Sequence, residues 1–524
     1  MAFAGVTTMD DKQSHYSTKM VLAVTGISMG AISYSYAGSI VGTTLGQPSF
    51  IQYMGLATNP NAEGLIGTVV GLFYAGGVFG ALLNTYLADS LGRRWTTAIG
   101  SIILVISTGC LAGSVNIAMF IVFRFFVGMG AYMLYLTTPL WVTELVPPRG
   151  RSILVGIVGL GGVVGYVLAA YVGVGFFYYD SKQAAQWRAP LAIGCLPPLL
   201  LLAFLPWLPE SPRFLLQKDR TEQAWAIVQD LHATAADSQH EYAQAEFFQM
   251  RKQHELDASL DGSWIAILRR RSYLRRAAIA FFLPVMLYST GNLVVTTYAA
   301  SVFAQLGYDA GASLQLLAGL YVGAIVGNLI SLTYVDRVPR HKMLAGGVVA
   351  VTIIISIETA LQATYLGTGN KSGLGATAAF LFLFLIFFNL FLEAISWYYA
   401  SEIFPTHLRS KGMTLGVIGF CLVDILWLEL APTAFATIGW KYYLVFICVS
   451  VVSAAFIFFT FPNTLHMPLE EVAKLFGDDD LVAVYQRDIH IDHEKHLVVE
   501  EAAEIEDVSA GTGTPSSSSK AHAV

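Results

Sequence analysis

Long apolar stretches alternate with short polar segments along most of this 524-residue chain. Because the hydrocarbon core of a bilayer is crossed by a helix of about 20 apolar residues, each stretch is a candidate membrane span. Six of them precede a long polar segment and six follow it. The twelve predicted spans are 20–42, 64–88, 96–115, 118–140, 152–177, 189–208, 277–304, 313–334, 342–366, 375–400, 411–433 and 441–461.

This pattern predicts an all-α membrane protein made of two six-helix bundles, at 20–208 and 277–461. Residues 1–19 form a short polar N-terminus, and the polar segment 209–276 is expected to be a cytoplasmic linker with helices. The tail, 462–524, is polar and ends in a low-complexity run of serines. Such a composition buries too little apolar surface to fold, so the tail is expected to be largely disordered.

Composition supports the membrane assignment and excludes several functions. Hydrophobic residues make up 55% of the chain and charged residues only 13%, against about 25% charged in soluble domains. The net charge of −6 disfavours a nucleic-acid partner. The four cysteines are far apart within apolar stretches, and no catalytic motif is present. We therefore expect no metal, no cofactor and no enzymatic activity.

Basic residues in the short loops predict the orientation. With the N-terminus in the cytoplasm, the cytoplasmic loops contain pairs of lysine or arginine, such as Arg93 with Arg94 and Arg409 with Lys411. The outer loops 43–63 and 305–312 contain neither residue. Both termini are therefore expected to be cytoplasmic.

Two charged motifs occur at equivalent places in the two halves. An aspartate and an arginine follow the second span of each half, and a glutamate and an arginine follow the fourth. The residues are Asp89 and Arg93 with Asp336 and Arg340, and Glu144 and Arg149 with Glu402 and Arg409. Such a duplication is typical of transporters made of two related bundles. We expect these carboxylate and guanidinium groups to form a cytoplasmic gate, although simple anchoring at the membrane surface is the alternative.

Further motifs resemble those of the sugar porter family of the major facilitator superfamily. Residues 209–213 read PESPR, Arg124 begins an R-x-x-x-G-x-G motif in the fourth span, and residues 462–471 resemble a degraded PETKG…LEE motif. Fungal hexose, lactose and polyol transporters are the most similar members. The resemblance implies alternating access, a monomer in the plasma membrane, and a gate that also includes Glu210 and Arg213.

The sequence departs from that family where sugars bind. Ala37 stands where proton-coupled members have aspartate, Val158 stands where a glutamine is usual, and the glutamines of the seventh span are absent. Hydroxyl groups need hydrogen-bonding partners, and C–H faces need aromatic rings. The matching positions that supply them are predicted to bind substrate: Tyr36, Tyr288, Asn292, Tyr298, Trp397 and Asp424.

Five ionisable residues remain inside the apolar spans: Arg124, Glu358, Glu393, Asp424 and Glu429. Since charged groups among lipid tails cost several kcal/mol, these residues should face the protein interior or a wet cavity. Arg124 is expected to tether the fourth span to a neighbour. Asp424 and Glu393 are the candidates for cavity-facing, proton-coupling groups. Glu429 is about 140° from Asp424 around the helix and cannot face the same cavity squarely.

The sequence thus predicts a secondary transporter for a small polar, sugar-like solute, which works by facilitated diffusion or proton symport. Two alternatives stay open. The weakened family motifs also fit a nutrient sensor that does not transport. Val158 and Tyr288 make the pocket less polar than a hexose site, which fits export of a less polar metabolite.

Overall fold

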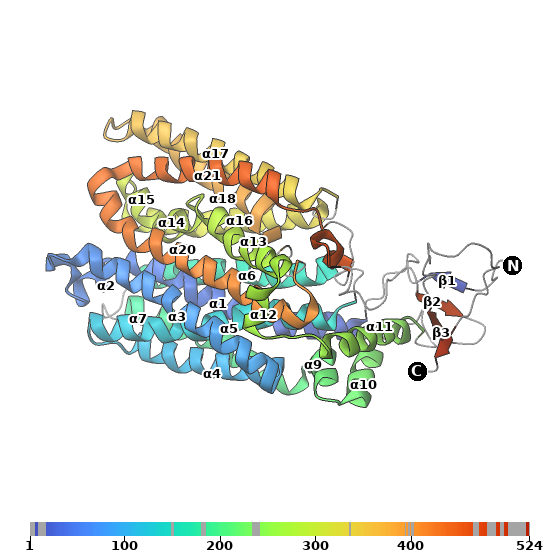
Figure 1. Cartoon of the computed structure of the whole chain (residues 1–524). Coiled ribbons are helices and arrows are strands. Elements are labelled where there is room, and N and C mark those ends of the chain that lie inside the picture. The colour runs from blue at the N-terminus through green and yellow to red at the C-terminus, as the bar shows by residue number, and fades with distance from the viewer. Residues whose placement is uncertain are drawn as a thin grey trace.

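The helices of a computed structural model form two bundles that lie side by side, with the N-terminal bundle below and the C-terminal bundle above in Figure 1. Short polar helices extend from one end of the bundles. The structure describes residues 6–8, 17–147, 151–179, 185–232, 241–334, 337–393, 395–396, 399, 403–464, 471–478, 489–492, 497–500 and 520–522.

The N-terminal bundle is built from the first six predicted spans. Its helices are α1 (Thr18–Leu45), α3 (Ala62–Leu91), α4 (Arg93–Ala112), α5 (Ile117–Leu145), α6 (Arg151–Phe177) and the broken pair α7 (Ala185–Ile193) and α8 (Leu196–Phe204). Two small outer helices, α2 (Pro48–Tyr53) and η1 (Leu56–Thr58), join α1 to α3, and η2 (Leu205–Trp207) follows α8. Polar caps begin the helices: the Ser17 hydroxyl accepts from the backbone N–H of Met20, and the Asn116 amide oxygen accepts from that of Met119.

The C-terminal bundle repeats this arrangement with more interruptions. Its helices are α13 (Arg271–Tyr288), α14 (Asn292–Thr297), α15 (Ala299–Gln305), α16 (Ala310–Tyr334), α17 (Arg340–Tyr365), α18 (Lys371–Phe388) with the π-helical turn η3 (Asn389–Glu393), α20 (Arg409–Ile438) and α21 (Tyr442–Thr460). The short 3₁₀ turns are η4 (Thr406–Leu408), η5 (Gly439–Lys441) and η6 (Glu471–Phe476).

Ten of the described segments are long and apolar enough to cross a bilayer. One of these, Arg409–Thr460, contains both α20 and α21. The remaining predicted span is the broken helix α13–α15, which turns at Gly291 with φ of +89°. A Cβ atom there would lie 2.7 Å from the Phe446 ring, so both the turn and the close packing require glycine. The twelve-helix prediction is confirmed.

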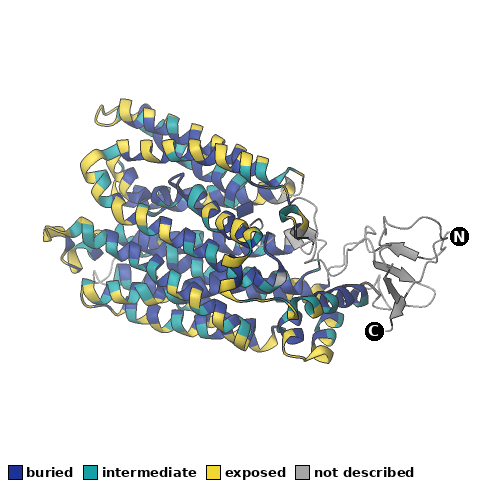
Figure 2. Cartoon of the chain, viewed as in Figure 1, coloured by how far each residue is buried: buried dark blue, intermediate teal, exposed yellow. Residues whose placement is uncertain are grey.

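Side-chain burial differs between the outer faces of the bundles and their interior. Large apolar residues such as Phe459 and Val452 are exposed. Exposed residues gather on the outer faces of the bundles (Figure 2), where a membrane protein meets lipid and not water. Small residues let helices approach closely inside the bundles. At Gly128 of α5, a Cβ atom would lie 1.8 Å from the Phe73 carbonyl oxygen of α3. The two bundles meet along α3 with α20 and along α6 with α16.

The described residues of the polar segment between the bundles form four helices: α9 (Pro212–Gln217), α10 (Thr221–His232), α11 (Glu241–Ala258) and α12 (Trp264–Arg269). They lie together at one end of the molecule, which we call the linker side (Figure 1). The end of α10 contacts α1, α5 and α11 there. Ser17 donates to the Leu231 carbonyl and Lys19 pairs with Asp230, which ties α10 to α1.

The chain ends also lie on the linker side. Strand β1 (Val6–Thr8) pairs with β2 (Ile489–Asp492), which continues through β3 (Leu497–Glu500) to β4 (Lys520–His522) in an antiparallel sheet. Asp478 of the tail contacts two arginines near the start of α13. Asp478 accepts from the buried Arg276 guanidinium at 2.6 Å and pairs with Arg270 at 2.7 Å.

His232 fastens the linker to the N-terminal bundle. Its Nδ1 lies 2.9 Å from the Glu246 carboxylate of α11, and its Nε2 lies 3.2 Å from the Leu145 carbonyl oxygen at the end of α5. Burial opposes protonation, but Glu246 and the carbonyl outweigh it and raise the pKa of His232. Protonation therefore strengthens the contact that His232 makes with α11 and with the end of α5.

We predict that this contact weakens with rising pH. A group with a raised folded-state pKa stabilises fully below its ordinary value, and the stabilisation is lost as pH rises through the raised value. His232→Gln should therefore lower the melting temperature at pH 6, by the equivalent of about 2 kcal/mol, and much less at pH 9. His254→Gln, on α11 but outside this contact, is the control. An equal effect of His232→Gln at both pH values would contradict the prediction.

Candidate functional site: a central cavity and a charged linker-side cavity

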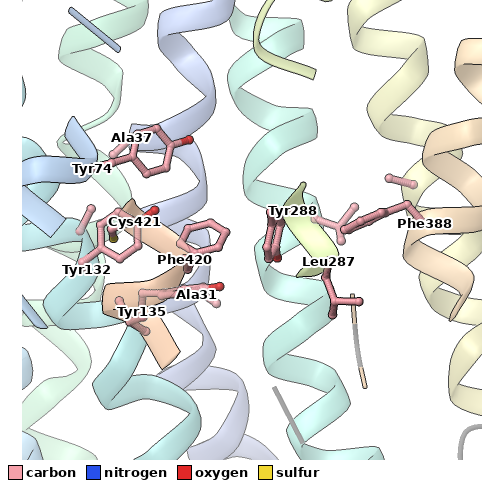
Figure 3. Close-up of a cluster of buried hydrophobic side chains, with 14 of the residues drawn as sticks. Ala31, Ala37, Tyr74, Tyr132, Tyr135, Leu287, Tyr288, Phe388, Phe420 and Cys421 are labelled. Carbon is pink, nitrogen blue, oxygen red and sulfur yellow. The ribbon is translucent and has the colours of Figure 1, made fainter. Parts of the chain in front are cut away.

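A central cavity lies between the two bundles and is lined by both. Among the described residues, six aromatic side chains come from the N-terminal bundle: Tyr34, Phe73, Tyr74, Tyr132, Tyr135 and Tyr166. Three more described ones come from the C-terminal bundle: Tyr288, Tyr321 and Phe420. Figure 3 shows part of this group, with Tyr74, Tyr132 and Tyr135 on one side of Phe420 and Tyr288 on the other. The Tyr288 and Phe420 rings are 4.4 Å apart, edge to face.

Polar side chains gather on the C-terminal half of the cavity. Asn292, Thr296, Thr297, Asn328, Asn389 and Glu393 all line it. The amide oxygens of Asn292 and Asn328 are buried and make no hydrogen bond to a described residue. Because a buried acceptor without a partner is costly, these oxygens are available for a bound solute.

The structure brings three of the predicted pocket residues to this cavity. Tyr288 and Asn292 line it, and the Tyr288 hydroxyl donates to the Glu393 carboxylate at 3.0 Å. Glu393 lies in the π-helical turn η3, which directs its carboxylate to the cavity. Val158 also lines the cavity, so the apolar character expected at that position is present.

Two predicted pocket tyrosines lie elsewhere. The Tyr36 hydroxyl donates to the Pro190 carbonyl at 2.8 Å and joins α1 to α7. The Tyr298 hydroxyl donates to the Leu428 carbonyl at 2.9 Å, between α14 and α20. Both hydroxyls are used in helix packing, so neither residue belongs to the cavity lining. Trp397 lies outside the described residues.

The acidic residues within the spans lie in different surroundings, and only some of them are near the cavity. Asp424 is 1% exposed and lies one turn beyond Phe420 on α20, behind the lining, although near enough to interact electrostatically with Glu393. Glu358 accepts from Gln362 at 2.7 Å within α17 and is fully buried. Glu429 is exposed beside Gly67 and Gly71 of α3. Glu393 is thus the one carboxylate among the described lining residues.

Sequence reasoning missed most of the aromatic lining. Tyr132 and Tyr135 are three residues apart on α5, and Phe73 and Tyr74 are adjacent on α3. Tyrosines in the middle of apolar spans were the available signal, because a hydroxyl there needs a polar partner or a wet cavity. The sequence does not show which spans face one another, so it could not assemble these rings into one site.

A second cavity on the linker side gathers several predicted gate residues. Asp89, Arg93 and Glu144 of the N-terminal bundle line it together with Arg409 of the C-terminal bundle. The Arg93 guanidinium donates to Glu144 at 2.8 Å, and both side chains are almost fully buried. Across the bundle interface, the Lys411 ammonium lies 3.7 Å from Asp89, and Thr85 contacts Thr414 through their hydroxyls.

Glu210 connects this region to α4. Its carboxylate accepts the backbone N–H groups of Arg93 at 3.0 Å and Arg94 at 3.3 Å, as expected for an acidic group at a helix N-terminus. Burial nevertheless raises the pKa of the Glu210 carboxyl. Arg213 is half-buried in α9, and the Arg340 backbone N–H donates to Asn463 at 3.2 Å. Arg149, Asp336 and Glu402 lie outside the described residues.

Comparisons with known proteins agree on one family. The profile described as "Sugar (and other) transporter" matches residues 23–476. The chain belongs to this family. It is therefore a member of a family of transporters, as the sequence motifs predicted, and that prediction is confirmed.

The relatives cover nearly the whole chain. The MFS-type transporter criB of Aspergillus cristatus is 31% identical over 462 residues, covering 88% of this chain and 93% of the relative. The high-affinity glucose transporter of Kluyveromyces lactis is 26% identical, covering 88% and 85%. The structure of the proton:xylose symporter XylE bound to 6-bromo-6-deoxy-D-glucose superimposes with a TM-score of 0.75 at 21% identity, covering 88% and 100%. That likeness confirms the major facilitator fold.

We predict that the Arg93–Glu144 pair stabilises the linker side. Glu144→Gln leaves a buried guanidinium without its carboxylate, so it should destabilise the purified protein by about 3 kcal/mol, measured as a lower melting temperature. The double variant Arg93→Met with Glu144→Leu should recover much of the loss, because neither buried charge remains. Glu63→Gln, at an exposed carboxylate of α3, is the control. Melting of Glu144→Gln at the temperature of this control would contradict the prediction.

Proposed function

We propose that this chain is a secondary transporter that moves a small, hydroxyl-bearing, sugar-like solute through the central cavity by alternating access. The observation that supports it best is the polar half of the cavity. Asn292 and Asn328 offer buried acceptor oxygens without described partners, and Glu393 adds a carboxylate. Hydroxyl groups of a solute are the donors that such acceptors select. The relative described as a high-affinity glucose transporter acts on a solute of this kind.

We propose that the charged residues of the linker side form the gate of this cycle. The Asp89–Lys411 contact joins the bundles on the linker side, and on the opposite side Gln315 of α16 donates to the hydroxyl of Tyr178, which directly follows α6. These contacts lie at the two ends of the path that crosses the cavity. For a solute to leave by one end, the contacts at that end must break while those at the other remain.

We propose a plasma-membrane protein that acts as a monomer with both termini in the cytoplasm. The excess of arginine and lysine on the linker side supports this orientation, as does the pairing of β1 with β2, which keeps both chain ends on one side. The cavity is complete within one chain, which supports a functional monomer.

We propose facilitated diffusion in preference to proton symport. Ala37 carries no proton, and Asp424 lies behind the cavity lining rather than in it. Glu393 is the carboxylate placed to exchange a proton with a bound solute, and its bond to Tyr288 holds it in one position.

The test is flux of labelled hexoses, polyols and carboxylated cyclitols into proteoliposomes of the purified protein. We expect saturable flux of at least one of them, without accumulation when a proton gradient is imposed. Accumulation that Glu393→Gln abolishes and Asp424→Asn retains would contradict facilitated diffusion and assign the proton to Glu393. Absence of flux for every solute, with an effect of the gene on transcription alone, would favour the sensor alternative instead.

A further inference from the structure

The central cavity has two chemically different walls. The aromatic wall consists of Tyr34, Phe73, Tyr74, Tyr132, Tyr135 and Tyr166 of the N-terminal bundle. The polar wall consists of Asn292, Thr296, Thr297, Asn328, Asn389 and Glu393 of the C-terminal bundle. The hydroxyl groups of a solute need hydrogen-bonding partners, whereas an apolar ring packs on other rings. The amides and the carboxylate lie on one wall here, and the other wall presents rings, five of them from tyrosines.

Five of the rings of the aromatic wall, all but Tyr166, form one connected surface. Tyr34 and Tyr135 are 4.4 Å apart between ring centroids, Tyr132 and Tyr135 are 5.4 Å apart, and Tyr74 and Tyr132 are 6.1 Å apart. Phe420 continues it towards Tyr288 (Figure 3). Val155 and Val158 also line the cavity. Such a surface matches a flat, apolar group, because offset and edge-to-face ring contacts add to the burial of area.

The charges of the lining restrict the solute further. Among the described residues that line the cavity there is no lysine, arginine or histidine, and Glu393 is acidic. Arg124 is nearby but 1% exposed, with its guanidinium directed to the carbonyls of Ala37 and Val69. An anionic solute would thus meet a carboxylate and no accessible cation.

We propose that the substrate is an amphipathic, non-anionic ring compound whose hydroxylated part binds the polar wall and whose aromatic ring packs on the aromatic wall. Glycosides of phenols are the simplest members of this class. The inference rests on the proposed transport function and specifies the substrate class of the same cavity.

Three matched glucosides test the proposal by binding to the purified full-length protein in nanodiscs. Methyl β-D-glucoside has the hydroxyl groups without an aromatic ring, phenyl β-D-glucoside adds the ring, and 4-carboxyphenyl β-D-glucoside adds a negative charge to that ring. We expect the phenyl compound to bind about tenfold more tightly than the methyl compound. The carboxyphenyl compound should bind more weakly than the phenyl compound.

Variants connect this preference to the aromatic wall. Tyr132→Leu should reduce the preference for the phenyl over the methyl compound to near unity, whereas Tyr132→Phe, which retains the ring, should keep it. Tyr86→Leu, at an exposed tyrosine of α3, is the control. If Tyr132→Leu does not fold, Tyr135→Leu serves the same purpose. The ratio of the affinities for the phenyl and methyl compounds, measured on the unaltered protein, tests the proposal without either variant.

The outcomes separate this inference from the proposed function. Equal affinity for the methyl and phenyl compounds, or tighter binding of the carboxyphenyl compound, would overturn the inference and leave transport of sugar-like solutes intact. Failure to bind either neutral glucoside, together with absence of flux for every hydroxylated solute, would overturn the proposed function as well.

Discussion

The guanidinium of Arg124 is buried in the apolar interior of the N-terminal bundle. Its hydrogen bonds connect the three helices α1, α3 and α5. From α5 it donates to the Val69 carbonyl of α3 at 3.3 Å and to the Ala37 carbonyl of α1 at 3.0 Å. Its flat face lies over the Phe73 ring at 4.3 Å. An unpaired charge at this depth would be very costly, so the bonds hold α1, α3 and α5 in one relative position.

The aromatic wall depends on that position. Tyr34 comes from α1, Phe73 and Tyr74 from α3, and Tyr132 and Tyr135 from α5. A shift among these helices would separate the rings and open the wall. The same helices carry Asp89 and Glu144 to the linker side, so the cavity and the charged contacts are built on one rigid unit. The C-terminal bundle contributes the polar wall and more irregular backbone, at Gly291 and at the π-helical turn η3. This division suits a mechanism in which one bundle moves against the other.

The sequence predicts the fold well because lipid imposes a simple rule on it. Every span must be apolar for about 20 residues, so the twelve spans and their order can be read directly. The Arg124 tether was also predictable, since a buried guanidinium must find acceptors. The cavity was harder. Tyr36 and Tyr298 have the right chemistry but their hydroxyls bond to backbone carbonyls of neighbouring helices, and only the rotation of each helix in the assembled bundle decides this. Glu393 faces the cavity because of a local π turn that no spacing rule indicates.

Reversible cross-linking of the two bundles tests alternating access through the central cavity. Thr85 of α3 and Thr414 of α20 are in contact on the linker side. In a variant in which Cys110, Cys195, Cys421 and Cys448 are replaced by alanine, Thr85→Cys with Thr414→Cys places two thiols there. Solute flux in proteoliposomes should be lost when these thiols are oxidised to a disulfide and restored by a reductant, while either single cysteine variant stays active throughout. Full flux with the disulfide quantitatively formed would contradict the account.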